Sequence, residues 1–442
     1  RYFYLVFFIY LNMKKTRFFY ELNYFLIVLL GWLLLFGKAA QINQSEKEEN
    51  VETEGDSGNM RTETEGTVSK KMTEPVIRVL LTDSAQLSCY HSSVTVNQEG
   101  KECIYNAESP ELQKGALILE GGDTGIAVPS IRRAQNPPVY YGTLEIRKTD
   151  EGLLLINELP LETYLEGVVP SEMPSSYEKE ALMAQAVCAR TYAICQIQEK
   201  SLKEEYDADV DDSVNYQVYG NFAADEKTSQ AVQETKGLIM CQNGNPITAY
   251  YFSTSAGQTS TDEIWGADRA ASYLKSVECD FDQNMPWSSW SVEIPWETLE
   301  KRAENLEGDG RLEGLQIVKK STSGAVTGVE LIKENCSVQI NGEYEIREFF
   351  SPSGFLVTEK DGSRVKGGSL LPSAYFEMEA EKGQIVRIQG KGYGHGVGMS
   401  QNGANEMAKK GYTWQEILTY FYRDITLESL NNWLGVDRTS VS

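Results

Sequence analysis

The pattern of apolar and polar positions divides the chain into three stretches of different character. Residues 24–36 form an uncharged apolar run that follows a basic flank. Residues 41–74 are rich in Glu, Thr, Ser, Asn and Gly and have almost nothing to bury, so we expect a disordered acidic linker there. From Pro75 the composition is that of a globular domain, which we expect to extend over residues 75–430.

The N-terminal segment carries an export signal. Residues 1–12 precede Met13, and we interpret them as upstream translation. Residues 13–40 combine a basic start with an apolar run that is shorter than the roughly 20 residues needed to span a bilayer. Gly37-Lys38-Ala39 would also serve as a signal-peptide cleavage site, so secretion after cleavage is the alternative. We favour a retained membrane anchor, with the remainder on the extracytoplasmic, cell-wall side.

The globular part mixes segregated strands and helices, which predicts an α+β fold. Short runs between Gly and Pro turns predict a small β-rich subdomain over residues 83–140. Leu161 begins a helix that we expect Gly167 and Pro170 to end. A second helix, with a predicted capping box formed by Ser175 and Glu178, runs into a segment that is apolar on all sides and is therefore expected to be buried.

The later segments give further predictions of secondary structure. Residues 226–236 predict a helix, and residues 247–254 predict a strand that ends in small hydroxyl side chains. Residues 315–388 read mostly as strands. Residues 400–410 predict a helix, and Thr413 with Glu416 forms the capping box of the next one. Three tryptophans are expected to pack outside the main core: Trp287, Trp290 and Trp296.

Glycine occupies every second position from Gly390 to Gly398. In an extended strand this alternation would leave one face without side chains. A bare face allows either another backbone or a ligand to lie directly on the chain. The run therefore predicts a tight packing seam or the floor of a binding groove. No phosphate-binding glycine pattern fits it.

Charge and composition exclude several classes of function. The net charge of −23 argues against binding to nucleic acid. His91 and His395 are the two histidines in the sequence, which excludes a multi-histidine metal site. Seven cysteines show no C-x-x-C motif; Cys89 and Cys103 could form a disulfide, whereas Cys188 and Cys195 are expected in the core.

Glu172 is the carboxylate with the most suggestive setting. It lies between Pro170 and Pro174, at the junction of the two predicted apolar helices. Apolar neighbours raise the pKa of a carboxyl group and keep it protonated near neutral pH, as a general acid for a glycosidic oxygen requires. A simple helix cap is the alternative. Arg190 is the only charged residue between Ala181 and Gln198. A buried charge needs a partner, so Arg190 predicts either a core salt bridge or a substrate contact.

Four motifs resemble the stage II sporulation protein D family, also called the SpoIID/LytB domain. They are Pro160-Leu-Glu-Thr-Tyr-Leu-Glu-Gly-Val-Val-Pro-Ser-Glu-Met-Pro174, Ala184-Gln-Ala-Val-Cys-Ala-Arg-Thr-Tyr192, Ser253-Thr-Ser-Ala-Gly257 and Gly392-Tyr-Gly-His-Gly-Val-Gly-Met-Ser-Gln401. The resemblance runs in order from about Val76 to Leu427.

This resemblance implies a membrane-anchored lytic transglycosylase that cleaves the MurNAc–GlcNAc bond of peptidoglycan strands stripped of stem peptides. It implies a role in engulfment during endospore formation, with an amidase of the stage II sporulation protein P type and a membrane protein of the stage II sporulation protein M type as partners. Glu172 matches the family's catalytic glutamate. The expected substrate-binding residues are Arg190, Gln185, Gln217, Tyr219, Ser253, Ser255, Tyr393, His395 and Gln401. Since Arg190 beside Glu172 would spoil the acid, we expect it to hold another carboxylate or the substrate.

Two departures from the family and one alternative function stand beside this prediction. Some members carry a Cys/His zinc site where this chain has Asp211, Asn215 and Tyr216, so we expect no metal and no cofactor. Phe252 occupies a position that is often His. Related LytB-type domains resemble wall-binding modifiers that stimulate an amidase without cutting, and this is the alternative to an enzyme.

The predicted topology has a direct test. The uncharged run 24–36 behind Lys14, Lys15 and Arg17 predicts that the globular part lies outside the cytoplasm. Protease added to intact protoplasts should release that part as a folded fragment. A globular part that resists protease until the membrane is lysed would contradict the topology.

Overall fold

The computed structural model describes residues 74–85, 88–200 and 202–435. The chain divides between Lys70 and Lys71, and all described residues belong to the second unit. The upstream segment 1–12, the signal or anchor 13–40 and residues 41–73 of the linker lie outside the described residues. Within the described part, no helix is long and apolar enough to cross a membrane.

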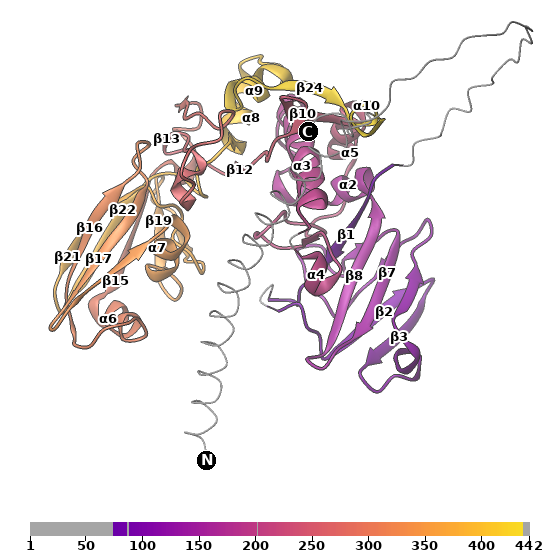
Figure 1. Cartoon of the computed structure of the whole chain (residues 1–442), viewed down its shortest axis with the longest axis horizontal. Coiled ribbons are helices and arrows are strands. Elements are labelled where there is room, and N and C mark those ends of the chain that lie inside the picture. Colours follow the sequence, from indigo (N-terminus) through magenta and orange to yellow (C-terminus); the bar gives the residue numbers. More distant parts are fainter. Residues whose placement is uncertain (1–73, 86–87, 201, 436–442) are drawn as a thin grey trace, which may run out of the picture. The chain divides into compact units, whose positions relative to one another are not determined.

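A five-stranded sheet and two helices form the first part of the fold (Figure 1). The helices are α2 (Leu161–Glu172) and α3 (Lys179–Glu199), and α2 follows directly on the longest strand of this sheet. The strands in spatial order are β4 (Leu117–Glu120), β7 (Thr143–Lys148), β8 (Leu153–Pro160), β1 (Val76–Leu80) and β9 (Val210–Asp211).

The predicted β-rich segment 83–140 does form short strands. A four-stranded sheet has the order β3 (Lys101–Asn106), β2 (Ser93–Gln98), β5 (Ile126–Ala127) and β6 (Val139–Tyr140), with a 3-10 turn η1 (Pro110–Lys114). Its buried side chains Val94, Val96 and Ile126 belong to the same hydrophobic cluster as α2 and α3. The segment therefore has no hydrophobic core of its own.

Helix α2 continues through the two residues that were expected to end it. Pro170 lies inside the helix, in its last turn, where a missing N–H costs a single hydrogen bond. Ser171 Oγ donates to the carbonyl oxygen of Gly167 at 2.7 Å. Gly167 is small because the Tyr219 ring packs on it: a Cβ there would lie 2.6 Å from Cε2 of that ring. Its role is packing and not helix termination.

The start of α3 also differs from the prediction. The helix begins at Lys179, and Glu178 is its N-cap, so Ser175 and Glu178 form no capping box. The preceding residues make a turn instead, in which Tyr177 N–H donates to the Pro174 carbonyl at 2.9 Å. Every residue of α3 from Ala181 to Gln196 is buried, which confirms the prediction of a helix buried on all sides.

The chain next forms short elements around α3. These are α4 (Lys203–Tyr206), α5 (Glu226–Glu234), β10 (Leu238–Gln242), β11 (Asn245–Pro246), β12 (Tyr251–Phe252), β13 (Gly257–Gln258), η2 (Asp262–Trp265), β14 (Glu278–Cys279) and η3 (Pro286–Ser288). Helix α5 confirms the helix predicted over residues 226–236. The strand predicted over residues 247–254 is reduced to β12, which pairs in parallel with β23 (Met399–Ser400).

A second hydrophobic cluster lies within residues 287–388. Its elements are β15 (Trp290–Pro295), α6 (Trp296–Glu304), β16 (Leu312–Lys320), β17 (Val326–Lys333), β18 (Ser337–Asn341), α7 (Glu343–Phe349), β19 (Leu356–Glu359), β20 (Arg364–Lys366), β21 (Phe376–Glu381) and β22 (Ile385–Gly390). Trp290 and Trp296 are buried in it, and Trp287 packs at its margin. The strand-rich prediction for residues 315–388 is confirmed, and α7 is an addition.

The C-terminal helices pack in the same hydrophobic cluster as α2 and α3. They are α8 (Gln401–Lys409) and α9 (Trp414–Phe421), followed by β24 (Thr426–Ser429) and α10 (Leu430–Gly435). Thr413 and Glu416 form both bonds of the predicted capping box. The buried residues of α9 are those of the predicted stripe: Trp414, Ile417, Leu418 and Phe421.

The glycine run is a packing seam and not an extended strand. Positive φ angles recur at every second residue, with 79° at Gly392, 105° at Gly394, 82° at Gly396 and 81° at Gly398. Side chains on these glycines would meet Thr254 O at 2.8 Å, Phe252 Cβ at 2.8 Å and Tyr375 Oη at 2.6 Å, and at Gly398 would collide with Tyr250 O. The glycine side thus contacts the protein's own chain, so it does not form the floor of a groove.

All seven cysteines are free thiols in the structure, so the suggested disulfide between Cys89 and Cys103 is absent. Cys188 and Cys195 are buried, as predicted. Cys188 lies 3.4 Å from the Tyr422 hydroxyl, and Cys195 donates to the Ile247 carbonyl at 3.1 Å. Burial also raises the pKa of both thiols to about 12, so they stay protonated at neutral pH. Both cysteines are therefore part of the core.

The seam predicts a sharp difference between two glycine substitutions. Gly398→Ala should lower the free energy of unfolding by at least about 3 kcal/mol, because backbone strain adds to the collision with Tyr250 O. Gly411 has a φ of 91° but nothing within 4 Å, so Gly411→Ala should cost only about 1–2 kcal/mol. Denaturant unfolding of both variants measures this; equal losses would show that the close approach at Gly398 is unimportant.

Candidate active site

Glu172 ends helix α2 and is the centre of the candidate site. Its Oε1 accepts a hydrogen bond from the Val218 backbone N–H at 2.7 Å. Gln401 Nε2, at the start of α8, lies 3.3 Å from the Glu172 carbonyl oxygen and 3.5 Å from Oε2. Residues far apart in the sequence therefore meet at one carboxyl group. Glu172 keeps part of its surface exposed, so a ligand could reach it.

The surroundings of Glu172 shift its proton affinity strongly. Burial among protein atoms raises its pKa from 4.5 to about 7, although hydrogen bonds from Val218, Gln401 and Tyr251 act in the opposite direction. The partial exposure of the side chain and the size of this shift are compatible, because an opening on one side leaves most of the water shell replaced by protein. The carboxyl group is thus poised both to give and to take a proton near neutral pH.

A chain of hydrogen bonds orients Tyr251 toward this carboxyl group. Tyr164 donates its hydroxyl proton to Gln217 Oε1 at 3.2 Å, and Gln217 Nε2 donates to the Tyr251 hydroxyl oxygen at 3.0 Å. The Tyr251 oxygen is occupied as an acceptor, which leaves its own proton for Glu172. Burial raises the pKa of Tyr251 well above its usual value, so it remains a donor.

Asp282 fixes the two segments that border the site. Its Oδ2 accepts the Ser255 backbone N–H at 2.7 Å and the Ser400 hydroxyl at 2.6 Å. Ser400 in turn caps α8 by accepting the Gly403 N–H at 3.1 Å. The start of α8, and with it Gln401, is thereby tied to the Ser253–Gly257 loop. Because Asp282 is fully buried, it acts through the residues it positions.

Arg190 does not reach Glu172. Its Nε and Nη2 donate to the two carboxylate oxygens of Glu162 at 2.8 Å each, and Nη1 donates to the Leu238 carbonyl at 3.2 Å. The Arg190 side chain has no exposed surface. This geometry is that of the core salt bridge and agrees with the expectation that Arg190 holds another carboxylate. The alternative of a substrate contact has no accessible surface to support it.

Four other predicted substrate contacts are also buried. Tyr219 donates its hydroxyl proton to Asn157 Oδ1 at 2.7 Å within the core, and Gln217 belongs to the chain that orients Tyr251. Ser255 donates to the Cys279 carbonyl at 3.2 Å. Gln185 Oε1 lies 3.5 Å from Gln401 Nε2, whereas its own Nε2 has no partner among the described residues. These four side chains lie in the protein interior next to the site, with almost no surface that a ligand could contact.

Three of the remaining predicted residues lie nearer the surface, whereas Gln401 is buried beside Glu172. Ser253 is partly exposed and Tyr393 is 42% exposed, with its ring 4.7 Å from that of Trp287. His395 is surrounded by the rings of Tyr250, Phe252 and Trp265, and the nearest, Trp265, lies 5.1 Å away.

The protonation state of His395 follows from this aromatic setting. Burial lowers its pKa to about 3, and its Nδ1 accepts the Val397 N–H at 3.1 Å. The imidazole is therefore neutral at physiological pH and presents a flat, uncharged face. Trp265, beside it, is 39% exposed.

Three contributors escaped the sequence analysis: Tyr251, Asp282 and Trp265. Tyr251 lies inside the predicted strand just ahead of Ser253, and the signal available was its place beside that motif. The local sequence does not distinguish the buried Asp282 from the aspartates on the surface, because its two partners are 27 and 118 residues away in sequence.

No metal site is evident in the described part of the chain, where no group of three or more His, Cys, Asp or Glu could hold an ion. Asp211 accepts hydrogen bonds from the Ser213 N–H at 2.8 Å and from the Asn215 amide at 3.3 Å. The expectation that the protein works without zinc stays a prediction.

The fold and site define an α+β protein with a partly exposed carboxyl group, Glu172, whose pKa is raised to about 7. Residues 149–241 match the family described as "Stage II sporulation protein". The chain is 32% identical to stage II sporulation protein D of Bacillus subtilis over 294 residues, which cover 63% of this chain and 78% of that protein. The chain therefore belongs to the stage II sporulation protein D family.

Two further relatives extend the comparison. Stage II sporulation protein D of Bacillus amyloliquefaciens is 32% identical, over 63% of this chain and 77% of that protein. The amidase enhancer of Bacillus subtilis is 30% identical, over 60% of this chain and 40% of that protein. The same domain thus occurs in relatives whose names describe different roles.

The raised pKa of Glu172 predicts a pH dependence of stability. Between pH 4.5 and about 7 the folded state holds the proton more tightly than the unfolded state, so this group stabilises the fold less as pH rises through that window. Glu172→Gln lacks this proton. Denaturant unfolding should show that the variant gains stability relative to the parent between pH 5 and pH 8. The control Glu166→Gln, on the same helix, should follow the parent, and a Glu172→Gln curve parallel to the parent's would contradict the assigned pKa.

Proposed function

We propose that this protein is a lytic transglycosylase that cleaves MurNAc–GlcNAc bonds in peptidoglycan strands stripped of stem peptides. The single observation that carries the proposal is the setting of Glu172: one partly exposed carboxyl group whose pKa is raised to about 7. Membership of the stage II sporulation protein D family supports the link to the cell wall in spore formation.

One carboxyl group is enough for this reaction. Glu172 first gives its proton to the glycosidic oxygen, and the bond from that oxygen to the anomeric carbon of MurNAc breaks. The carboxylate then takes the proton of the sugar's own 6-hydroxyl, whose oxygen bonds to the anomeric carbon and closes a 1,6-anhydro ring. No water is activated, so the second carboxylate of a hydrolase is unnecessary.

The neighbours of Glu172 suit both halves of this cycle. Burial favours the protonated form that starts the reaction, whereas hydrogen bonds from Val218 N–H, Gln401 and Tyr251 stabilise the carboxylate that follows. A pKa near neutral pH lies close to the optimum for a group that must act as acid and then as base. The buried Asp282 already binds Ser255 and Ser400, which supports a mechanism with Glu172 alone.

The surface beside the site offers contacts for a glycan. The exposed rings of Tyr393 and Trp265 present flat apolar faces, and the partly exposed Ser253 supplies a polar group. Ligand sites commonly combine aromatic walls with a few polar groups that fix orientation. We assign Ser253, Tyr393 and His395 to the contact surface. The supporting residues are Gln185, Gln217, Tyr219, Ser255 and Gln401, which is buried beside Glu172.

The proposed setting is the wall side of the membrane. An amidase of the stage II sporulation protein P type would strip the stem peptides first, and a membrane protein of the stage II sporulation protein M type would complete the assembly. Both partners are proposed from the family resemblance, as is the anchoring of the chain by its N-terminal segment.

A second candidate is a modifier that stimulates an amidase without cutting glycan. The observation that favours it is the 30% identity to the amidase enhancer of Bacillus subtilis. A modifier requires wall binding but no proton transfer, so it gives no reason for the raised pKa of Glu172. The enzyme therefore explains more of the site.

Glu172→Gln separates the two candidates. The variant keeps the shape of the side chain but cannot deliver a proton, so release of anhydro-ended fragments from amidase-treated peptidoglycan should fall at least about 10²–10⁴-fold. Strand binding should change little, and at pH 5, where the parent carboxyl group is protonated, the two melting temperatures should be similar. Glu166→Gln, on the same helix and hydrogen-bonded to Gln233, is the matched control and should cut normally.

Two outcomes would count against the enzyme. A folded Glu172→Gln variant that still cuts at the parent's rate would place the acid elsewhere. A parent protein that releases no anhydro ends, yet binds strands and accelerates an amidase, would favour the modifier.

A further inference from the structure

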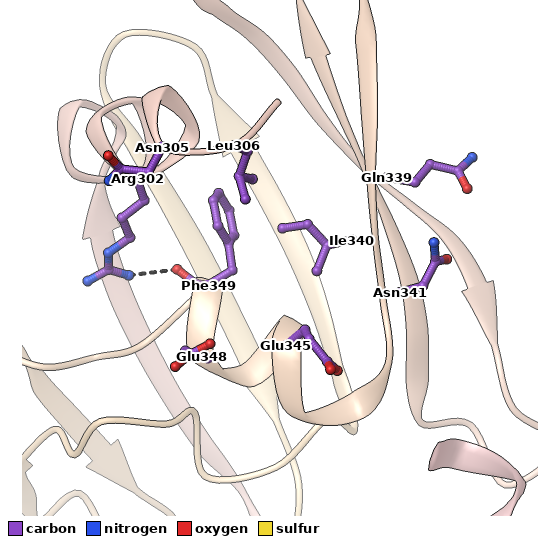
Figure 2. A pocket seen from close by; sticks show the side chains of 9 residues that line it. All are labelled: Arg302, Asn305, Leu306, Gln339, Ile340, Asn341, Glu345, Glu348 and Phe349. Carbon is purple, nitrogen blue, oxygen red and sulfur yellow. Dashed lines mark hydrogen bonds between the residues drawn. The ribbon is translucent and has the colours of Figure 1, made fainter. Parts of the chain in front are cut away.

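A cavity of about 600 Å³ lies in the second hydrophobic cluster, apart from the Glu172 site. It opens between helix α6, helix α7 and strand β18, and Figure 2 shows its lining side chains. Its size falls within the range of small-molecule and peptide sites. None of the residues in the proposed glycan site contributes to it. The lining residues are Arg302, Asn305, Leu306, Gln339, Ile340, Asn341, Glu345, Glu348 and Phe349.

The floor of the cavity is apolar. Ile340 and Phe349 are each 8% exposed, and Leu306 is partly buried beside them. The Phe349 ring packs edge-on against Phe350, with centroids 4.9 Å apart, so the floor is firmly held. Such a floor accepts the aliphatic part of a ligand.

A guanidinium group without a carboxylate partner lies at one side of this floor. Arg302 Nη1 donates to the Phe349 carbonyl at 2.8 Å, and no ion pair is formed by Arg302 within the described residues. Burial lowers its pKa, which means that the charge is partly desolvated without compensation. A ligand carboxylate would supply the missing partner through a charge-assisted hydrogen bond.

Two of the glutamates on α7, Glu345 and Glu348, line the cavity. In the view of Figure 2, Glu345 and Arg302 are on opposite sides of the Phe349 ring. Glu345 and Glu348 are exposed, and neither forms an ion pair within the part of the chain that the structure describes. Three carboxamides complete the rim: Asn305, Gln339 and Asn341. Carboxamides both donate and accept, which matches the peptide group.

We propose that this cavity binds a short peptide that carries both a free carboxylate and a free amine, the chemistry of a peptidoglycan stem. The ligand carboxylate pairs with Arg302, the amine pairs with Glu345 and Glu348, and aliphatic groups cover Leu306, Ile340 and Phe349. The assignment to a wall peptide rests on the proposed function, whereas the need for both charges rests on the cavity alone. Such a site would hold peptide-bearing wall while the Glu172 site acts on stripped strands.

The test is calorimetric titration of the full chain with the tetrapeptide L-Ala-γ-D-Glu-meso-diaminopimelate-D-Ala. Two analogues serve as probes, one with its amines acetylated and one with its carboxylates amidated. Each block should weaken binding about tenfold or more, because it removes a charge-assisted hydrogen bond. Glu345→Gln and Glu348→Gln should weaken binding of the parent peptide, while acetylation should then add little further loss.

The matched control is Glu379→Gln, which neutralises an exposed glutamate of the same cluster's β21 outside the cavity. It should bind like the parent. Three outcomes would overturn the proposal. They are absence of binding, binding of the amidated peptide as tight as that of the parent peptide, and binding by Glu345→Gln and Glu348→Gln as tight as that of the parent protein. The second outcome would point to a basic segment of a partner protein as the ligand. Peptide binding by Glu172→Gln should be unchanged, so loss of glycan cleavage and failure of this site are measured separately.

Discussion

The close approach of the glycine run to residues 250–256 is the constraint on which the candidate site depends. Gly398 lies against the Tyr250 carbonyl, and the next residue, Met399, donates its N–H to the same oxygen at 3.1 Å. This contact sets the parallel pairing of β12 with β23, in which Tyr251 is opposite Met399. Tyr251 and Gln401, from distant parts of the sequence, are thereby brought to Glu172. A side chain at Gly398 would separate the donors from the acid they serve.

The chemistry of Glu172 results from a balance that the rest of the core maintains. Burial alone would raise the pKa of Glu172 further, and the donors Val218 N–H, Gln401 and Tyr251 moderate that effect. A nearby cation would overcorrect and keep the group ionised. Arg190, the one charged residue of α3 between Ala181 and Gln198, is kept from doing so by its bidentate pair with Glu162. The salt bridge thus pairs the Arg190 charge with a carboxylate other than Glu172.

Local signals in the sequence predicted the elements that depend on local interactions. The buried helix α3, the stripe of α9 and the box of Thr413 with Glu416 follow from periodicity and capping chemistry, which act within a few residues. Glu172 was singled out for the same reason, because its prolines and apolar neighbours adjoin it in sequence. The wrong predictions concern contacts with distant segments: Asn405 accepts the Glu178 N–H, where a local Ser175 cap was expected.

The glycine run shows why the periodicity of a sequence alone does not predict a structure that depends on contacts with distant segments. Alternation at every second residue suggests a strand, but glycine also permits positive φ, and the repeat here alternates backbone conformations as well as side chains. The consequence is a chain that bends at each glycine while it follows the contour of residues 250–256. Alternating glycines fit both an extended strand and a chain with positive φ angles. The backbone of residues 250–256, against which the run packs, decides between the two geometries. The glycine run, which the sequence suggested as the floor of a groove, therefore packs two segments of the site against each other. The surface available to a ligand is formed by Tyr393, His395 and the side chains that this packing positions.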